Sequence, residues 1–368
     1  EYRYYWVKQG IKFLTDGIPY NYRNHRITDN LGWFTGQKIG KSDEKLQFRR
    51  LFRRDTDFHE DMFLAGKGVD PDQYDMPVYR HDNWKMAYQW YDKSREMVAK
   101  FGEQYTNDMM FYRKRPMQLM NQARGLEEEF EADDIMQEIW RNAHQEWTEF
   151  GQQEIRSTSG LPVTFEGLSE MDAELTSARQ ELDELVPGYR DSYMQEVRDS
   201  AGLNDVQLAA LDVPADERTA EEEIVAAAAQ GMIQKASAGV DRRIAENAKP
   251  DDIVAARRIA QKIDRIMAQM RFAESYAETV NYKYWSVRSE TEARDDVKAA
   301  RQAMFRAEEM KRNSIFDDEF QYDPATGEKT LKKKGAISLF EEAFDMWNSV
   351  LDSPDVAFDV LADGEVID

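Results

Sequence analysis

An internal repeat at an offset of 34 residues is the feature that most constrains the fold of this chain. The segment that begins at Gly10 (GIKFLTDGIPYN) aligns with the segment that begins at Glu44 (EKLQFRRLFRRD), so that Leu14 falls on Phe48. Repeats of this length are typical of helical hairpins, which cannot bury their apolar faces alone and stack on their neighbours. The alternative is a pair of unrelated amphipathic helices that lie 34 residues apart by chance.

The residues between the two segments favour the repeat. The run 31–34 (LGWF) is followed by small or apolar residues at 36, 39 and 40. Gly17 and Gly32 would let paired helices approach closely, while Trp33, Phe48 and Phe52 would fill the space between them. This arrangement is the signature of a two-helix tetratricopeptide unit. We therefore predict an all-α fold of tetratricopeptide-like (TPR-like) helical hairpins that form an α-solenoid with an extended helical insertion.

Turn formers and helical periodicity organise the next part of the chain. Gly and Pro residues concentrate in a predicted loop at 66–82, and Asn83 is the predicted N-cap of a helix at 84–101. A further single helix is predicted at 118–150. After Gly151 aromatic residues become rare and Ala and Glu dominate. Helices of that composition suit an exposed or extended insertion better than a packed core.

The last part of the chain again has clear helical patterns. Apolar stripes predict long helices at 251–288 and 290–313, and the pattern at 336–351 predicts the second helix of a closing hairpin. The predicted parts of the chain are 1–65 (TPR-like repeats), 66–150 (helical continuation), 151–250 (acidic Ala/Glu-rich helical insertion) and 251–368 (long helices and a closing TPR-like hairpin).

Several of these motifs resemble those of a known group of proteins. The segments 6–11 (WVKQGI), 17–21 (GIPYN), 31–34 (LGWF) and 38–40 (KIG), with the closing run 336–354, are similar to large TPR-containing proteins of planctomycetes and related bacteria. Those proteins often carry the label "IRE (iron responsive element)", which implies no mechanism. The resemblance implies a bacterial protein that is membrane-anchored through a hydrophobic helix upstream of Glu1. It implies no catalytic residue.

Charge excludes one class of partner. The chain has a net charge of −22. Residues 1–120 hold 21 basic and 17 acidic side chains, so the excess of acid lies in the rest of the chain. A chain this acidic repels phosphate backbones, and we expect no nucleic-acid binding. The absence of cysteine excludes disulfides and thiolate chemistry but does not fix the compartment.

The sequence also bears on membrane association. No stretch approaches the roughly 18–20 apolar residues that span a bilayer. The chain opens at Glu1 without Met, and we expect it to be a fragment or a processed form. Membrane attachment would then depend on a segment upstream of Glu1, and the localisation is otherwise open.

One acidic cluster has the residue types of a metal site. Asp55, Asp57, His59, Glu60 and Asp61 lie close together in the sequence, and carboxylates with imidazole bind Zn, Mn or Fe. The spacing matches neither His-Glu-x-x-His nor the Glu-x-x-His of di-iron bundles. We favour a solvated helix end. The alternative is a metal-dependent all-α enzyme or metal-binding protein with a site near His59, Glu60 and Asp61.

Two arginine pairs, at 49–50 and 53–54, form the densest basic group. Residues four apart share a helix face, so Arg50 and Arg54 could hold an acidic peptide or anionic lipid headgroups. The alternative that we favour is local ion pairing. Its partners would be Asp43, Glu44, Asp55 and Asp57.

The chain begins with the aromatic side chains Tyr2, Tyr4, Tyr5 and Trp6. We expect them to pack against a preceding repeat. A membrane-interface belt is the alternative.

These features together favour a non-enzymatic scaffold or adaptor that binds other proteins. We expect no catalytic residue, cofactor, metal or small-molecule substrate. A purely architectural role in a membrane-bound complex is a further alternative. The predicted protein-binding residues are Tyr20, Tyr22, Arg23, Arg26, Trp33, Gln37, Arg50 and Arg54.

Overall fold

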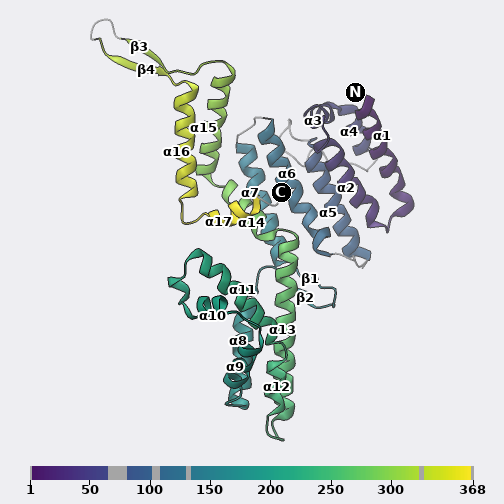
Figure 1. Cartoon of the computed structure of the whole chain (residues 1–368). Helices are drawn as coiled ribbons and strands as arrows, with labels where there is room; N and C mark the ends of the chain where they lie inside the picture. The colour runs from purple at the N-terminus through teal and green to yellow at the C-terminus, as the bar shows by residue number, and fades with distance from the viewer. Residues whose placement is uncertain (1, 65–80, 102–107, 130–133, 323–326, 366–368) are drawn as a thin grey trace. The chain divides into compact units, whose positions relative to one another are not determined.

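A computed structural model of the chain describes residues 2–64, 81–101, 108–129, 134–322 and 327–365. Helices make up 76% of the structure, which confirms the predicted all-α class. The described residues form seventeen α-helices and two small two-stranded sheets (Figure 1). No helix in these ranges is both long and apolar enough to cross a membrane. The predicted loop at 66–82 lies almost entirely outside the described residues.

The chain folds into two compact units. The first unit consists of residues 1–155 and 276–368, and the middle unit consists of residues 156–275. The middle unit is thus inserted between two parts of the first unit. The insertion expected from the sequence covered 151–250. The middle unit extends to residue 275, so it also includes most of the long helix that follows residue 250.

The first unit begins with four α-helices and a short 3₁₀ turn. They are α1 (Tyr2–Gly17), η1 (Pro19–Asn21), α2 (His25–Gly40), α3 (Lys45–Arg54) and α4 (Thr56–Leu64). Phe48 and Phe52 are buried in the core that these helices share, as predicted. Trp33 was expected to fill the same space but is 47% exposed. The buried positions Leu31, Thr35 and Ile39 define the inner face of α2, and Trp33 falls outside it.

Glycines let α2 approach α5 (Asn83–Phe101) closely. Gly32, Gly36 and Gly40 are spaced four residues apart and face the next helix. A Cβ atom at Gly32 would lie 2.8 Å from the ring of Tyr91, and one at Gly40 would lie 2.1 Å from the ring of Trp84. The predicted role of Gly32 in close packing is therefore confirmed, with α5 as the helix that it contacts.

Two local predictions for this region were wrong. The N-cap of α5 is Asp82, whose carboxylate accepts hydrogen bonds from the backbone N–H groups of Trp84 at 2.9 Å and Lys85 at 3.4 Å. The single helix predicted at 118–150 is two helices, α6 (Asp108–Glu128) and α7 (Asp134–Gln152), which pack against each other. Acidic side chains accumulate between them, and negative charge disfavours a helix C-terminus but favours an N-terminus.

The first unit is completed by the last helices of the chain. They are α14 (Tyr282–Glu292), α15 (Asp295–Arg312), α16 (Ala336–Leu351) and α17 (Phe358–Glu365). α14 packs on α7, and α15 packs on α16. Each of these last two helices buries small residues, such as Ala303 on α15 and Ala343 on α16. In the sequence, an antiparallel pair of strands lies between α15 and α16. The strands are β3 (Glu319–Tyr322) and β4 (Lys329–Lys333), and all residues of both strands are exposed.

The middle unit has a hydrophobic core of its own. Its elements are β1 (Ile155–Arg156), β2 (Pro162–Val163), α8 (Leu168–Leu185), α9 (Arg190–Ser200), α10 (Asp205–Asp212), η3 (Ala215–Glu217), α11 (Ala220–Ala236), α12 (Val240–Glu246) and most of α13 (Ile253–Thr279). Leu182, Ile244 and Ile263 are fully buried in this core. The expectation of an unpacked insertion was therefore wrong, because α8, α12 and α13 bury branched apolar residues in this core, whereas the buried residues of the Ala-rich α11 are only Ala226 and Ala229.

The long helix predicted at 251–288 was also too long. α13 ends at Thr279, and α14 begins after Asn281, which has φ 50° and ψ 44°. Asparagine tolerates this left-handed conformation better than most residues. Asn281 thus separates a helix of the middle unit from a helix of the first unit.

Candidate functional site

Four large aromatic side chains on α1 are exposed to solvent. We call Tyr2, Tyr5, Trp6 and Phe13 the α1 aromatic face; their exposed fractions are 75%, 48%, 57% and 77%. Residues at i, i+4 and i+11 lie on one side of a helix, so Tyr2, Trp6 and Phe13 form a row. The rings of Tyr2 and Tyr5 contact that of Trp6, with centroids 6.2 Å and 5.4 Å away.

The basic side chains of α1 are engaged elsewhere. Lys8 pairs with Asp55 at 2.6 Å, and Lys12 pairs with Asp61 at 2.9 Å. Both acids belong to the segment that contains α3 and α4. Tyr4, the buried member of the aromatic start, also donates a hydrogen bond to Asp55 at 3.0 Å. These contacts fix the orientation of α1 and leave its aromatic face directed away from the core.

The structure places the predicted protein-binding residues on three segments. Tyr20, Tyr22 and Arg23 lie in and after η1, and the Arg23 guanidinium is 5.4 Å from the ring of Tyr22. The members on α2 are Arg26, Trp33 and Gln37, and those on α3 are Arg50 and Arg54. All are exposed except Gln37, which is half-buried. The aromatic residues of α1 were not included in the predicted set.

Arg49 and Arg53 have different surroundings from Arg50 and Arg54. Arg49 is 2% exposed; it donates a hydrogen bond to Asp82 at 3.0 Å and pairs with Glu129 at 2.7 Å. Arg53 also pairs with Glu129. The partners are therefore not the local acids that the sequence favoured. Asp82 and Glu129 come from the start of α5 and the end of α6, so these ion pairs join three helices.

The proposed metal-binding residues do not converge. His59 is buried, and its Nε2 lies 2.7 Å from the carbonyl oxygen of Phe52, while its ring stacks on His81 at 3.8 Å. Glu60 and Asp61 are exposed. The described part of the chain contains no group of three or more His, Asp or Glu side chains that could hold a metal ion. Burial lowers the pKa of His59 to about 4, with a smaller contribution from His81.

A polar cluster between α5, α6 and α7 was not predicted. Tyr88 donates to Glu146 at 2.7 Å, and Arg115 pairs with the same carboxylate at 2.9 Å. Burial raises the pKa of Glu146 and of Tyr88. These three groups bind one another and thereby join the helices. Their distance in the sequence left no local signal from which the cluster could have been found.

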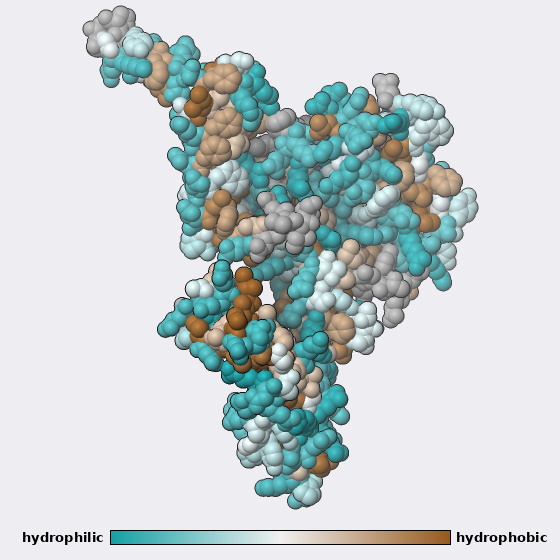
Figure 2. Space-filling model, viewed as in Figure 1, coloured by the Kyte–Doolittle hydropathy of each residue, from teal (hydrophilic) through white to brown (hydrophobic). Residues whose placement is uncertain are grey.

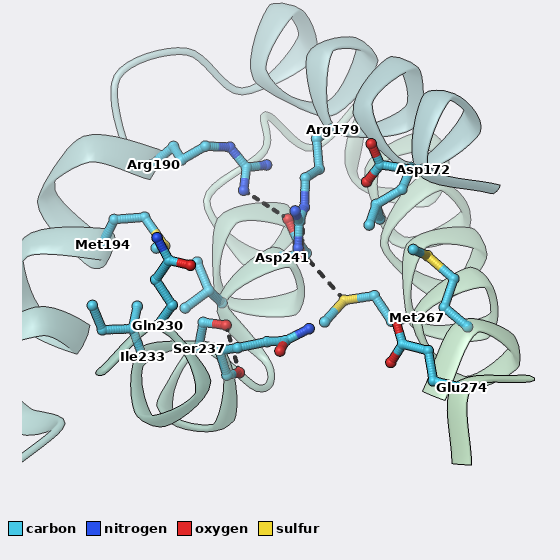
Figure 3. Close-up of a pocket in the computed structure, with 14 residues that line it drawn as sticks. Asp172, Arg179, Arg190, Met194, Gln230, Ile233, Ser237, Asp241, Met267 and Glu274 are labelled. Atoms are coloured by element: carbon cyan, nitrogen blue, oxygen red, sulfur yellow. Dashed lines mark hydrogen bonds and ion pairs between the residues drawn. The ribbon is translucent and has the colours of Figure 1, made fainter. Parts of the chain in front are cut away.

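The middle unit contains a cavity of about 400 Å³ (Figure 3). Five helices, α8, α9, α11, α12 and α13, contribute to its wall. Asp241 lies at its centre, where Arg190 approaches it at 2.9 Å and Arg179 at 3.7 Å. Arg179 also donates to the sulfur of Met267 at 3.6 Å. The cavity therefore combines an apolar wall with a charged group of two arginines and one carboxylate.

Apolar side chains are also exposed on the arm formed by α15 and α16. Figure 2 shows tan and brown residues along this arm. Ile337 and Phe344 of α16 are 53% and 54% exposed. This surface is adjacent to the β3–β4 hairpin, which carries exposed Phe320 and Tyr322.

Comparisons with known proteins add no assignment. No family model matches the chain. No curated protein and no solved structure matches it either. The site residues are therefore interpreted from their own geometry.

Proposed function

We propose that this chain is a non-enzymatic scaffold that binds another protein through the α1 aromatic face. The observation that carries the proposal is the exposure of Tyr2, Trp6 and Phe13 in one row along the helix. Tyr and Trp are enriched among the residues that dominate protein–protein binding energy. Contiguous exposed apolar surface of this kind marks interaction sites more often than isolated exposed side chains do.

Charges on the neighbouring helix α3 indicate the character of the partner. α3 lies next to α1 through the contact between Tyr4 and Phe48, whose ring centroids are 6.1 Å apart. The outer side of α3 exposes Arg50 and Arg54. A partner helix with an apolar stripe and acidic flanks would complement both surfaces, since charges at the rim of an interface guide orientation and association.

The scaffold itself would be a stack of TPR-like helical hairpins. Support comes from consecutive helices that pack on each other, α1 on α2, α5 on α6, α6 on α7, and α15 on α16. The 34-residue offset pairs the end of α1 and η1 with the whole of α3, so the two segments are not equivalent helices. The resemblance to membrane-anchored repeat proteins favours a membrane-associated complex as the setting.

Affinity capture with surface variants tests the proposal. The full chain is immobilised, native extract is passed over it, and captured proteins are quantified by mass spectrometry. Trp6→Ser combined with Phe13→Ser should abolish capture of the partner, because both side chains are lost from the row. The partner is then purified, and its affinity for the original chain and for the double variant is measured by calorimetry.

The matched control removes two equally exposed apolar side chains elsewhere. Val206 and Ile224 of the middle unit are 67% and 72% exposed. Val206→Ser with Ile224→Ser should leave capture unchanged. Equal capture by both double variants, or no stoichiometric partner for the original chain, contradicts the assignment of the α1 aromatic face.

A further inference from the structure

The cavity of the middle unit has the features of a ligand site that is independent of the α1 aromatic face. We propose that it binds an amphiphile with an unbranched alkyl chain and a carboxylate head, and that Arg179 holds the head. The argument rests on the apolar wall, the size of the cavity and the incomplete pairing of Arg179.

The wall of the cavity is mainly apolar and contains three methionines. Its apolar side chains are Leu175, Met194, Ile233, Val240, Met267 and Met270. Methionine is unbranched and adapts its shape to what it contacts, which suits a flexible alkyl chain. Apolar pockets with a few polar groups at one point are the usual form of small-molecule sites.

The volume limits the length of the ligand. At about 400 Å³ the cavity is near the lower end of the range for ligand pockets. If each heavy atom takes the roughly 30 Å³ of a liquid water molecule, about a dozen heavy atoms fit. A ten-carbon carboxylate is of this size.

The two arginines differ in how well they are paired. Arg190 donates to Asp183 at 2.6 Å and pairs with Asp241 at 2.9 Å. Arg179 reaches Asp241 only at 3.7 Å, and its other contact is the weakly accepting sulfur of Met267. Arg179 is 36% exposed, so it can be reached by a ligand. A carboxylate would provide the strong acceptor that Arg179 lacks.

Two acidic side chains at the edge of the cavity would favour a ligand with a positively charged head. Asp172 and Glu274 line the cavity but are exposed to water. Water screens these exposed acids strongly. The buried carboxylate of Asp241, 3.7 Å from Arg179, would also repel an anionic head, but its charge is offset by the ion pair with Arg190 at 2.9 Å. We therefore assign the head group to Arg179 and make a cationic head an outcome of the test.

The experiment is isothermal titration calorimetry of the purified full chain with three ten-carbon probes, each below its micellar concentration or its solubility limit. The probes are decanoate, decanol and decylamine, which share the chain and differ in the head. Decanoate should bind one to one and more tightly than either of the other two. If none of the three probes shows saturable binding, the proposal is overturned.

Two variants separate head from chain. Arg179→Gln should weaken the binding of decanoate about tenfold or more, as expected for loss of a hydrogen bond to a charged group. The same substitution should leave the affinity for decanol unchanged. Ile233→Trp should weaken binding of both probes, because the larger side chain occupies part of the cavity. Arg198→Gln is the control, because Arg198 pairs with Asp212 in the same unit and does not line the cavity.

Far-UV circular dichroism melts verify that each variant is folded. Tighter binding of decylamine than decanoate assigns the head to Asp172 and Glu274 and overturns the role of Arg179. Binding that neither variant changes locates the probes elsewhere on the chain and overturns the site.

Discussion

The guanidinium of Arg49 lies directly against the α-carbon of Gly125. A methyl group added at Gly125 would lie 1.7 Å from Nη1 of Arg49, which is far inside van der Waals contact. Gly125 is on α6, and Arg49 is on α3. The close approach lets Arg49 reach both Asp82 and Glu129, so the absence of a side chain at one position permits ion pairs at two others.

Gly125→Ala should therefore destabilise the first unit strongly. The methyl group would displace Arg49 and leave buried carboxylates without their cation, and breaking a buried ion pair costs about 3–5 kcal/mol. Urea denaturation followed by tryptophan fluorescence measures this unit alone, because all eight tryptophans of the chain lie in it.

Gly17→Ala provides the control in the same unit. A Cβ atom at Gly17 would meet only Ile27, at 3.9 Å, which is an ordinary contact. The sequence had assigned Gly17 a role in close helix packing, and the structure does not support it. We expect an unchanged or slightly higher stability, by up to about 1 kcal/mol. Equal urea midpoints for the two variants would contradict the assigned role of Gly125.

Neighbouring arginines on α3 should differ sharply in their effect on stability. Arg49→Met removes the buried cation and should lower the free energy of unfolding by about 3–5 kcal/mol. Arg50→Ala with Arg54→Ala removes exposed side chains, and the free energy of unfolding should stay within about 0.5 kcal/mol of that of the original chain.

In affinity capture the double variant Arg50→Ala with Arg54→Ala should weaken binding of an acidic partner. Unchanged capture would remove Arg50 and Arg54 from the proposed interface.

The sequence predicted which side chains would be buried better than which would be exposed. Phe48 and Phe52 are buried, as predicted, whereas Trp33, for which the same was predicted, is 47% exposed. On α1 the pattern was ambiguous, because aromatic residues occupy both sides of the helix. Tyr4 is buried and Trp6 is exposed, and only the packing partners of α1 decide between them.

The long-range ion pairs could not be predicted from local charge patterns. Arg49 and Asp82 are 33 residues apart, and Arg53 and Glu129 are 76 apart. Acids nearer in the sequence are equally plausible partners until the helices are placed. The cavity was missed for the same reason, since Arg179, Arg190 and Asp241 come from three different helices.

The buried His59 should make the first unit less stable in mild acid. Its pKa is about 4 in the folded state and 6.5 in the unfolded chain, so the unfolded chain binds the proton first as the pH falls. The contribution of neutral His59 to the stability of the folded state is complete above about pH 6.5. It is lost progressively toward pH 4, by about 3 kcal/mol in total, at 1.4 kcal/mol per pH unit.

His59→Gln should remove this contribution. Urea midpoints measured between pH 7 and pH 4 should decrease less steeply for His59→Gln than for the original chain. Asp55, Lys8 and His81 also act on this histidine, and they remain in the variant. His144→Gln, on α7, is the control with the same substitution. A slope that His59→Gln leaves unchanged would show that this histidine is not the titrating group.

Arg301 joins the end of the chain to its first part. It is bound by Glu292 of α14, at 2.6 Å, and by Glu127 of α6, and its guanidinium lies 5.3 Å from the ring of Trp347. Arg301→Met would leave the two carboxylates facing each other, and at pH 7 we expect a loss of about 3–5 kcal/mol. The loss should diminish toward pH 5, because burial already raises the pKa of Glu127 and removal of the cation raises it further.

The control for this substitution is Arg141→Met. Arg141 pairs with Asp295 at 3.1 Å, but its side chain is 56% exposed, so its loss should change stability by less than about 1 kcal/mol. Urea titrations at pH 7 and pH 5 compare the two variants. If Arg301→Met is no worse than Arg141→Met at pH 7, the attachment of α15 to α6 and α14 depends on apolar packing, and the ion pairs contribute little to it.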